Sequence, residues 1–224
     1  MSTPKISKSR YIVSIALFSA LAFVLMVLEF HVPVVPSFLK FDFSELPELI
    51  GTFTLGPVAG VIIALVKNLL HMPLSGTSYV GELANFLVAI SMIIPAGLIY
   101  KYKKTRKGAL IACLVGSIVM AIVSLPINLY ITYPFYYNFM PEEAIVSMYQ
   151  AIVPASDTIL KSLCIFNIPF TFAKGIIASI ITFLVYKPIS RLIKDFHPKK
   201  KKKILEQHIE ESTNNQEENT NSGL

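Results

Sequence analysis

The sequence predicts an all-α fold: a polytopic membrane protein with six transmembrane helices and both termini in the cytoplasm. Of its 224 residues, 54% are hydrophobic and only 15% are charged, whereas a soluble domain carries about 25% charged residues. The apolar residues gather in long blocks, and the block at 11–28 contains no charged residue. A block of about 18 such residues can cross a bilayer as a helix.

Basic residues flank these blocks and determine the predicted orientation. The formal net charge is +6, and the basic clusters are Lys101, Lys103, Lys104, Arg106 and Lys107 between two blocks and the lysines at 199–203 after the last block. Lys and Arg are enriched on the cytoplasmic side of membrane proteins. We therefore place both clusters in the cytoplasm, and the predicted partner of this charge is the lipid bilayer and not nucleic acid.

Residues 11–193 form the predicted transmembrane domain, which follows a cytoplasmic N-terminus at 1–10. Prolines, glycines and charges divide it into helices expected at 11–28, 44–55, 58–72, 80–100, 109–133 and 166–187. The segment 134–165, with its prolines and acidic residues, is expected to be external and to contain partial helices. A helix at 44–55 would be only about 18 Å long, so we expect it to be tilted, extended or partly re-entrant.

The C-terminal segment at 194–224 has a different composition. Five lysines are followed by a stretch rich in Glu, Asn, Gln and Thr. Such a composition cannot bury enough apolar surface to order itself. We therefore predict a disordered cytoplasmic tail that is first basic and then polar.

Ionisable and amide side chains fall inside or beside the predicted spans. Ionisable groups at membrane depth are costly and are functional candidates by default. In the predicted topology they gather in the outer half of the membrane, where they predict a pocket open to the exterior. They are Lys67, Glu82, Lys174, the set Asp42, Glu45 and Glu48, and the amides Asn85 and Asn128.

Structural roles for the same residues stay open. Asp42, Ser44 and Glu45 can cap a helix and favour its dipole. Lys67 can be a structural partner of Glu82 or Glu48. Asn128 follows Pro126 closely and can satisfy carbonyl groups freed by that proline. His31 and His71 lie at span ends and are expected to be interfacial, so no metal site is predicted.

The sequence contains no catalytic constellation, so we predict that the protein is not an enzyme. It lacks an HExxH motif and a nucleophile elbow. The segment Gly51–Gly56 begins like a phosphate-binding loop, but Pro57 stands where that loop needs a lysine. If transport is active, another chain must hydrolyse the ATP.

Small residues on the first helix predict a second surface. Ala16 and Ala20 lie four residues apart, with Ser19 beside them. Small side chains at this spacing allow another membrane helix to approach closely. Ordinary packing inside the protein is the alternative.

Six short motifs, in this order and with this spacing, resemble the riboflavin-specific S component, the substrate-binding subunit, of energy-coupling factor (ECF) transporters. They are FLKFDFSELP at 38–47, GPVAG at 56–60, VKNLLH at 66–71, GELANF at 81–86, NLYITYP at 128–134 and PFTFAKG at 169–175. Each motif alone is weakly specific, but the ordered set covers roughly residues 10–191.

The resemblance implies a multi-pass subunit of the bacterial cytoplasmic membrane that binds riboflavin near the extracellular face. Riboflavin would be the transported ligand, and no cofactor is implied. Such a subunit docks on a transmembrane coupling subunit and two ATPase subunits, and it is thought to carry its substrate by tipping over in the membrane. Ala16 and Ala20 correspond to the small-residue motif that this family uses for docking.

The resemblance also assigns binding residues. Asn128 matches an asparagine that contacts the flavin ring, and Lys174 matches the lysine of the family motif Pro-Phe-Asn-x-x-Lys-Gly. Thr171 replaces the asparagine of that motif, which affects the expected specificity. The chemistry fits a flavin, because an amide complements its edge, a lysine donates to a carbonyl oxygen and aromatic rings pack on its faces. The complete predicted site is Asn128, Lys174, Thr171, Asn85, Glu82, Phe41, Asp42, Phe43 and Lys67.

Other functions stay open at this point. Thr171 would support an S component for a different vitamin, and a flavin nucleotide, FMN or FAD, would need a pocket mouth that admits phosphate. A self-sufficient secondary transporter or an intramembrane enzyme is a third possibility. Against it, the chain is short and has no evident inverted repeat.

Overall fold

The computed structural model describes residues 7–36, 38–75 and 79–195, with side chains up to residue 185. The chain divides into two compact units, one ending at Tyr186 and the other beginning at Lys187. Of the second unit only residues 187–195 are described, and they are helical. Almost all of the predicted tail at 194–224, and most of the predicted N-terminus at 1–10, lie outside the described residues.

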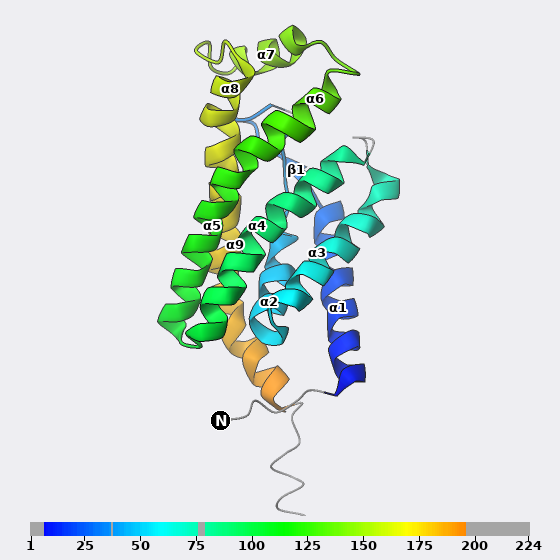
Figure 1. Ribbon diagram of the computed structural model, residues 1–224, viewed down its shortest axis with the longest axis vertical. Coiled ribbons are helices and arrows are strands. Elements are labelled where there is room, and N and C mark those ends of the chain that lie inside the picture. The colour runs from blue at the N-terminus through cyan, green and yellow to red at the C-terminus, as the bar shows by residue number, and fades with distance from the viewer. Residues whose placement is uncertain (1–6, 37, 76–78, 196–224) are drawn as a thin grey trace, which may run out of the picture. The chain divides into compact units, whose positions relative to one another are not determined.

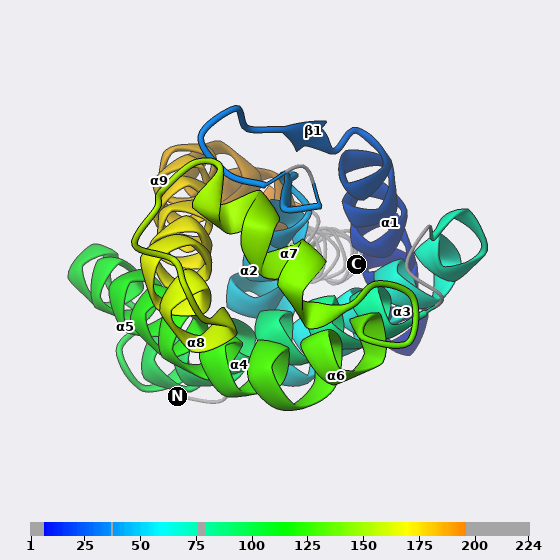
Figure 2. The same ribbon diagram turned by 90° about the horizontal axis from the view of Figure 1, so that it is seen from above.

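Helices make up most of the first unit (Figures 1 and 2). The main helices are α1 (Lys8–Val27), α2 (Glu45–Leu55), α3 (Pro57–His71), α4 (Val80–Tyr102), α5 (Arg106–Ile127) and α9 (Ile168–Asp195). Shorter elements connect them: η1 (Met72–Leu74), η2 (Asn128–Thr132), α6 (Tyr133–Tyr136), α7 (Glu142–Gln150), α8 (Ile159–Ser162) and η3 (Leu163–Asn167). Of these, η1 is a 3₁₀-helix, whereas η2 and η3 are π-helical turns within longer helices.

A small hairpin departs from the predicted all-α fold. Between α1 and α2, the strands β1 (Phe30–His31) and β2 (Lys40–Phe41) pair antiparallel, with Phe30 opposite Phe41. Prolines at 33 and 36 lie between the strands. The predicted loop in this region is therefore partly ordered as a two-stranded ribbon.

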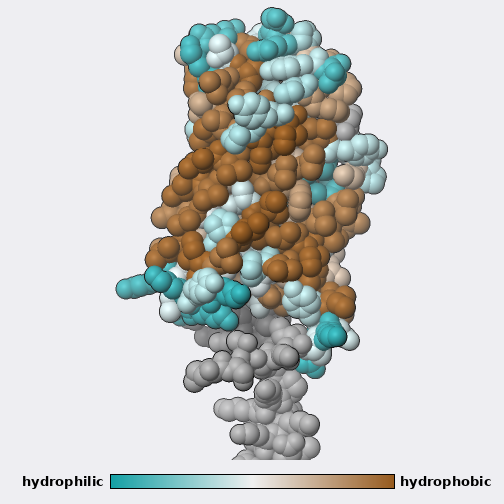
Figure 3. Space-filling view, in the orientation of Figure 1, coloured by the Kyte–Doolittle hydropathy of each residue, from teal (hydrophilic) through white to brown (hydrophobic). Residues whose placement is uncertain are grey.

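Five helices among the described residues are long and apolar enough to cross a membrane, at 8–27, 57–74, 80–102, 106–136 and 159–185. Their outward side chains are apolar; Leu17, Ile122 and Leu184 are each more than 60% exposed. Figure 3 shows a broad apolar surface with hydrophilic residues towards its ends. A multi-pass helical membrane protein is thus confirmed, whereas six crossings and the cytoplasmic location of both termini stay predictions.

The short helix α2 lies among longer helices, because its side chains are apolar on most sides. It packs against α1, α3 and α4, and Leu49, Ile50 and Phe53 are buried. Figure 2 shows it near the middle of the bundle. With 11 residues, α2 is too short to span a bilayer as a helix.

A sharp turn separates α2 from α3. Gly56 has a φ of 106°, a backbone conformation that glycine adopts without a steric penalty. Pro57 follows at the first position of α3, where its missing N–H costs nothing. Gly56 and Pro57 therefore allow α3 to run back beside α2.

The segment after α6 forms a small apolar cluster of its own. Tyr133, Ile145, Tyr149 and Phe166 belong to it, and they come from α6, α7 and η3. The hydroxyl groups of Tyr133 and Tyr149 are hydrogen-bonded to each other, and Tyr149 also donates to Asn167 Oδ1 at 2.9 Å. The partial helices expected at 134–165 are thus α7 and α8.

The contact of α2 with α3 depends on a missing side chain at Gly60. A Cβ atom there would lie 1.9 Å from Thr52 Oγ1 and 2.9 Å from Ile93 Cγ2. Thr52 Oγ1 donates to the carbonyl of Glu48 at 2.7 Å, so it is held in place. Even one methyl group at Gly60 would therefore force the helices apart.

We predict that Gly60→Ala lowers the free energy of unfolding by about 1–3 kcal/mol, because a close-packed contact becomes overpacked. Thermal unfolding of the purified protein in detergent measures this change. Val58→Ala is the matched control, since Val58 lies on the exposed side of the same helix. Equal melting temperatures for Gly60→Ala and the wild type would contradict the packing described here.

Candidate functional site

A cavity of about 240 Å³ lies inside the first unit. This volume is slightly below the range of about 300–1,000 Å³ of typical small-molecule sites. Its lining comes from the hairpin, the N-terminal end of α2, the adjoining ends of α3 and α4, the α5–η2 junction and α9. Segments far apart in the sequence therefore contribute to one site.

Most of the predicted site residues line this cavity, and three do not. Those that line it are Asn128, Lys174, Thr171, Asn85, Glu82 and Asp42. Phe41, Phe43 and Lys67 lie outside the lining. Predicted site residues from four of the six motifs therefore lie together in one region of the fold.

Lys174 connects α9 to the start of α2. Its Nζ atom lies 2.9 Å from Asp42 Oδ2 and 2.6 Å from Glu45 Oε1, and all three residues are buried. Asp42 Oδ1 also accepts a hydrogen bond from the backbone N–H of Ser44 at 2.7 Å. Asp42 thus both supports the helix start and pairs with Lys174. Asp42 can therefore support the start of α2 and also line the cavity.

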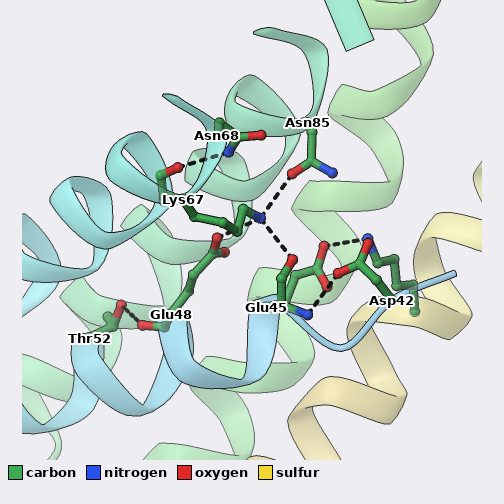
Figure 4. Close-up of polar contacts among 10 residues, drawn as sticks. Asp42, Glu45, Glu48, Thr52, Lys67, Asn68 and Asn85 are labelled. Atoms are coloured by element: carbon green, nitrogen blue, oxygen red, sulfur yellow. Dashed lines mark hydrogen bonds and ion pairs between the residues drawn. The ribbon is translucent and has the colours of Figure 1, made fainter. Parts of the chain in front are cut away.

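Lys67 is fully buried and forms a second cluster beside the first (Figure 4). Its Nζ atom lies 2.7 Å from Glu48 Oε1, and it donates to Ser44 Oγ at 2.8 Å and to Asn85 Oδ1 at 3.0 Å. Ser44 therefore uses its hydroxyl group for Lys67 and makes no side-chain cap of α2. This geometry favours the structural reading of Lys67, with Glu48 and not Glu82 as its partner.

Glu82 of α4 pairs with His71 of α3, and both residues line the cavity. Its Oε1 atom lies 3.0 Å from His71 Nδ1, and both side chains are buried and line the cavity. His71 ends α3, and Glu82 lies in the first turn of α4. The sequence places His71 at the end of a span, but the fold turns this end towards the cavity and not towards an interface.

The predicted aromatic residues Phe41 and Phe43 lie behind the cavity lining. Phe41 packs against Phe30, Phe43 and Phe170, with ring centroids 5.4, 5.3 and 6.0 Å away. Of these rings, only Phe170 lines the cavity. The hairpin turns Phe41 into this cluster, where its ring packs against Phe170; Phe38 and Tyr136 are further aromatic residues of the cavity lining.

Two π-helical turns present asparagines to the cavity. Asn128 begins η2, and Asn167 ends η3; both line the cavity. Such turns occur frequently at functional sites. Asn128 Nδ2 donates to the carbonyl of Ser124 at 2.8 Å, which leaves Oδ1 outside that bond. Pro126 frees the carbonyl four residues before it, at 122, so the bond to Ser124 is not the compensation expected from the sequence, and the ligand role of Asn128 stays a prediction.

Sequence reasoning missed Asn167, Thr132, Tyr136 and Phe170, although they line the cavity. Helical periodicity contained a usable signal. Asn167 lies four residues before Thr171 and seven before Lys174, and residues at this spacing share a helix face. Thr132 and Tyr136 lie four and eight residues after Asn128.

The small-residue surface of α1 faces outward. Ala16 and Ala20 are exposed, whereas Ser19 is buried against the rest of the bundle. Leu17, beside them, is 67% exposed. Ala16 and Ala20 therefore do not take part in packing within the described part of this chain.

Apolar helices long enough to cross a membrane surround a cavity with polar side chains, which defines the class of this protein: a multi-pass membrane protein with a polar-lined cavity. Residues 10–186 match the family described as ECF transporter, substrate-specific component. The chain belongs to this family, which confirms the resemblance seen in the motifs.

Similar proteins are found in several bacteria. The chain is 35% identical over 187 residues to riboflavin transporter RibU of Staphylococcus aureus (strain TCH60), covering 84% of this chain and 94% of that protein. It is 31% identical over 183 residues to riboflavin transporter FmnP of Bacillus subtilis (strain 168), covering 80% and 91%. A solved S component of a bacterial ECF transporter has a TM-score of 0.68 and 36% identity, covering 84% of this chain and 99% of that chain.

We predict that Lys67→Met destabilises the fold, because it leaves Glu48 as a buried carboxylate without its partner, at a cost of about 3–5 kcal/mol. Thermal unfolding in detergent measures the loss, and adding Glu48→Gln should restore part of it. Lys161→Met is the control, since the pair of Lys161 with Asp157 is exposed and contributes about 0–1 kcal/mol. An unchanged melting temperature combined with weaker ligand binding would instead assign Lys67 to the ligand.

Proposed function

We propose that this chain is the riboflavin-binding S component of an ECF-type importer in the bacterial cytoplasmic membrane. It captures the vitamin and performs no chemistry on it. The observation that carries the proposal is the cavity, which combines amide, hydroxyl and ammonium groups with apolar walls inside a membrane protein of this family. The similar S. aureus and B. subtilis proteins are both named riboflavin transporters, which supports the same ligand here.

The flavin ring has flat apolar faces and an edge of carbonyl groups with one imide N–H. Amide and hydroxyl side chains can both donate to and accept from such an edge. Asn128, Asn167 and Thr171 offer these groups from two neighbouring helices. Thr171 lacks the carboxamide of the family motif, but Asn167 supplies one a single turn earlier. Apolar contact for the ring faces comes from Leu39, Val88, Met120 and Phe170.

Lys174 can serve the ligand while it remains paired. An ammonium group has three N–H donors, and its contacts with Asp42 and Glu45 occupy two of them. The third donor is available for a carbonyl oxygen of the ring. Asp42 and Glu45 therefore position Lys174 for the ligand.

The charges around the cavity favour an uncharged flavin over FMN or FAD. Both lysines of the described lining are already ion-paired to lining carboxylates, Lys40 to Glu29 and Lys174 to Asp42 and Glu45. Glu82 adds a further carboxylate. A phosphate group would thus meet an excess of negative charge, and like charges at short distance repel.

The proposed importer takes its energy from other chains. The sequence has no phosphate-binding loop, so we assign ATP hydrolysis to two ATPase subunits that act through a transmembrane coupling subunit. The exposed Ala16 and Ala20 of α1 are the proposed docking surface for the coupling subunit. Small residues let the backbones of two membrane helices approach closely.

The first test of this function is ligand binding. The protein purified in detergent should carry or bind riboflavin, detected by its colour and fluorescence, and should bind FMN more weakly. Asn128→Ala should weaken riboflavin binding by about 1–3 kcal/mol, because it removes a hydrogen bond and leaves a polar group unpaired. Titration of flavin fluorescence measures the affinity.

Asn138→Ala is the matched control for Asn128→Ala. Asn138 also donates to a backbone carbonyl, that of Phe135 at 2.9 Å, but it is exposed and outside the cavity. Its replacement should leave the affinity unchanged. Equal affinities for Asn128→Ala and the wild type would reject the proposed ring position, and a protein that binds another vitamin but no flavin would reject riboflavin.

The second test concerns docking. Ala16→Leu should leave riboflavin binding intact and abolish uptake by cells that express the complete transporter, because a bulky side chain prevents close helix approach. Ala173→Leu, on the exposed side of α9, should affect neither. Loss of binding in Ala16→Leu, or normal uptake, would contradict the proposed role of this face.

A further inference from the structure

A tyrosine of the connecting helix α7 lies directly behind the wall of the cavity. Tyr149 is fully buried and is not part of the lining, but it contacts two residues that are, Asn167 and Phe38. Its hydroxyl group donates to Asn167 Oδ1 at 2.9 Å, and its ring centroid lies 5.5 Å from that of Phe38. Figure 1 shows α7 at one end of the bundle, and in Figure 2 it lies across that end. A hydrogen bond therefore connects a helix outside the long apolar helices to the ligand space.

Tyr133, Tyr149 and Asn167 form a hydrogen-bonded chain with a fixed direction. A tyrosine hydroxyl group has one hydrogen, and an amide oxygen can only accept. Tyr149 uses its hydrogen for Asn167 Oδ1, so in the bond between the two hydroxyl groups Tyr133 donates and Tyr149 accepts. All three residues are buried. Hydrogen bonds in such a chain strengthen one another where the local dielectric constant is low.

The chain determines how the amide of Asn167 is oriented. An asparagine amide has nearly the same shape in its two orientations, which exchange an acceptor for a donor. If the amide of Asn167 turned over, its nitrogen would donate to Tyr149, and Tyr149 would have to donate to Tyr133. The buried hydrogen of Tyr133 would then lose the acceptor that Tyr149 now provides, which is costly. The oxygen of the amide therefore stays on Tyr149, and its nitrogen is the group left to donate.

We propose that Tyr149 is a positioning residue for the ligand: its hydroxyl group fixes the amide of Asn167 so that the amide nitrogen donates to a carbonyl oxygen of the flavin ring. This proposal rests on the proposed function, in which Asn167 is one of the groups that meet the polar edge of the ring. Tyr149 itself does not touch the ligand. An amide that is already oriented improves the affinity, because binding does not have to order it.

A purely structural role is the alternative to this assignment. The ring of Tyr149 packs against Phe166, with ring centroids 5.2 Å apart, and belongs to the apolar cluster that joins α7 to η3. Loss of that packing would weaken ligand binding whether or not Asn167 is present. Tyr149→Phe keeps the ring and removes only the hydroxyl group. An effect of Tyr149→Phe that requires Asn167 therefore identifies positioning, and an effect that does not require it identifies structural support.

The experiment is a double-mutant cycle. Riboflavin dissociation constants are measured by fluorescence titration in detergent for the wild type, Tyr149→Phe, Asn167→Ala and the double variant. Tyr149→Phe should weaken binding about fivefold in the wild-type background, the equivalent of one net hydrogen bond. In the Asn167→Ala background the same change should alter the dissociation constant by less than about twofold. Asn167→Asp, which still accepts from Tyr149 but cannot donate when ionised, should bind riboflavin no better than Asn167→Ala.

Tyr137→Phe is the matched control, because Tyr137 packs against the same apolar cluster but its hydroxyl group is not part of the chain; its affinity should equal that of the wild type. Unchanged affinity in Tyr149→Phe, or an equal loss in both backgrounds, overturns the proposal. If Tyr149→Phe does not fold, Asn167→Asp still tests the assignment, since wild-type affinity in that variant would mean that the amide nitrogen does not donate to the ligand. A wild-type protein that binds no riboflavin rejects the proposed function itself, before any substitution is made.

Discussion

The fold depends on the ion pairs between the N-terminal end of α2 and the lysines of two other helices. Asp42, Glu45 and Glu48 would place three carboxylates in the interior of an apolar bundle, which is prohibitive unless each has a partner. Lys174 of α9 and Lys67 of α3 supply these partners at 2.6–2.9 Å. Because Asp42, Glu45 and Lys174 also line the cavity, the interactions that hold α2 in place form one wall of the binding site.

Two π-helical turns within longer helices shape another part of the cavity. The π-helical turns at Asn128–Thr132 and Leu163–Asn167 each bring an asparagine to the cavity, and the same two helices add Thr132, Thr171 and Lys174. Polar groups held by backbone and ion pairs inside an apolar enclosure suit binding without chemistry. In the proposed function, the outward face of α1 serves docking and the cavity serves capture of the ligand, so the two roles use different surfaces of the protein.

Much of this arrangement was predictable from sequence, and the exceptions have physical reasons. Long apolar blocks located the helices, and α3 begins at Pro57 where a start at 58 was expected, but the last helix, expected to end at 187, continues to Asp195. Depth in the membrane identified Lys174 and Asp42 as site residues, but it could not determine which carboxylate pairs with Lys67, because that depends on how α2 turns at Gly56. Phe41 and Phe43 were predicted to contact the ligand but do not line the cavity. Strands of two residues show no periodicity, so the sequence did not reveal the hairpin that turns Phe41 away. Asn167 was missed, although it lies four residues before Thr171, because the motif that identified the site residues of this helix begins only at 169.

The most direct test of this account is an experimental structure of the purified protein with riboflavin. The account predicts the three-ring system inside the cavity, with its polar edge at Asn128 and Lys174 and with the Lys174–Asp42 and Lys174–Glu45 pairs intact. A flavin bound outside this cavity, or Lys174 separated from both carboxylates in the complex, would contradict it.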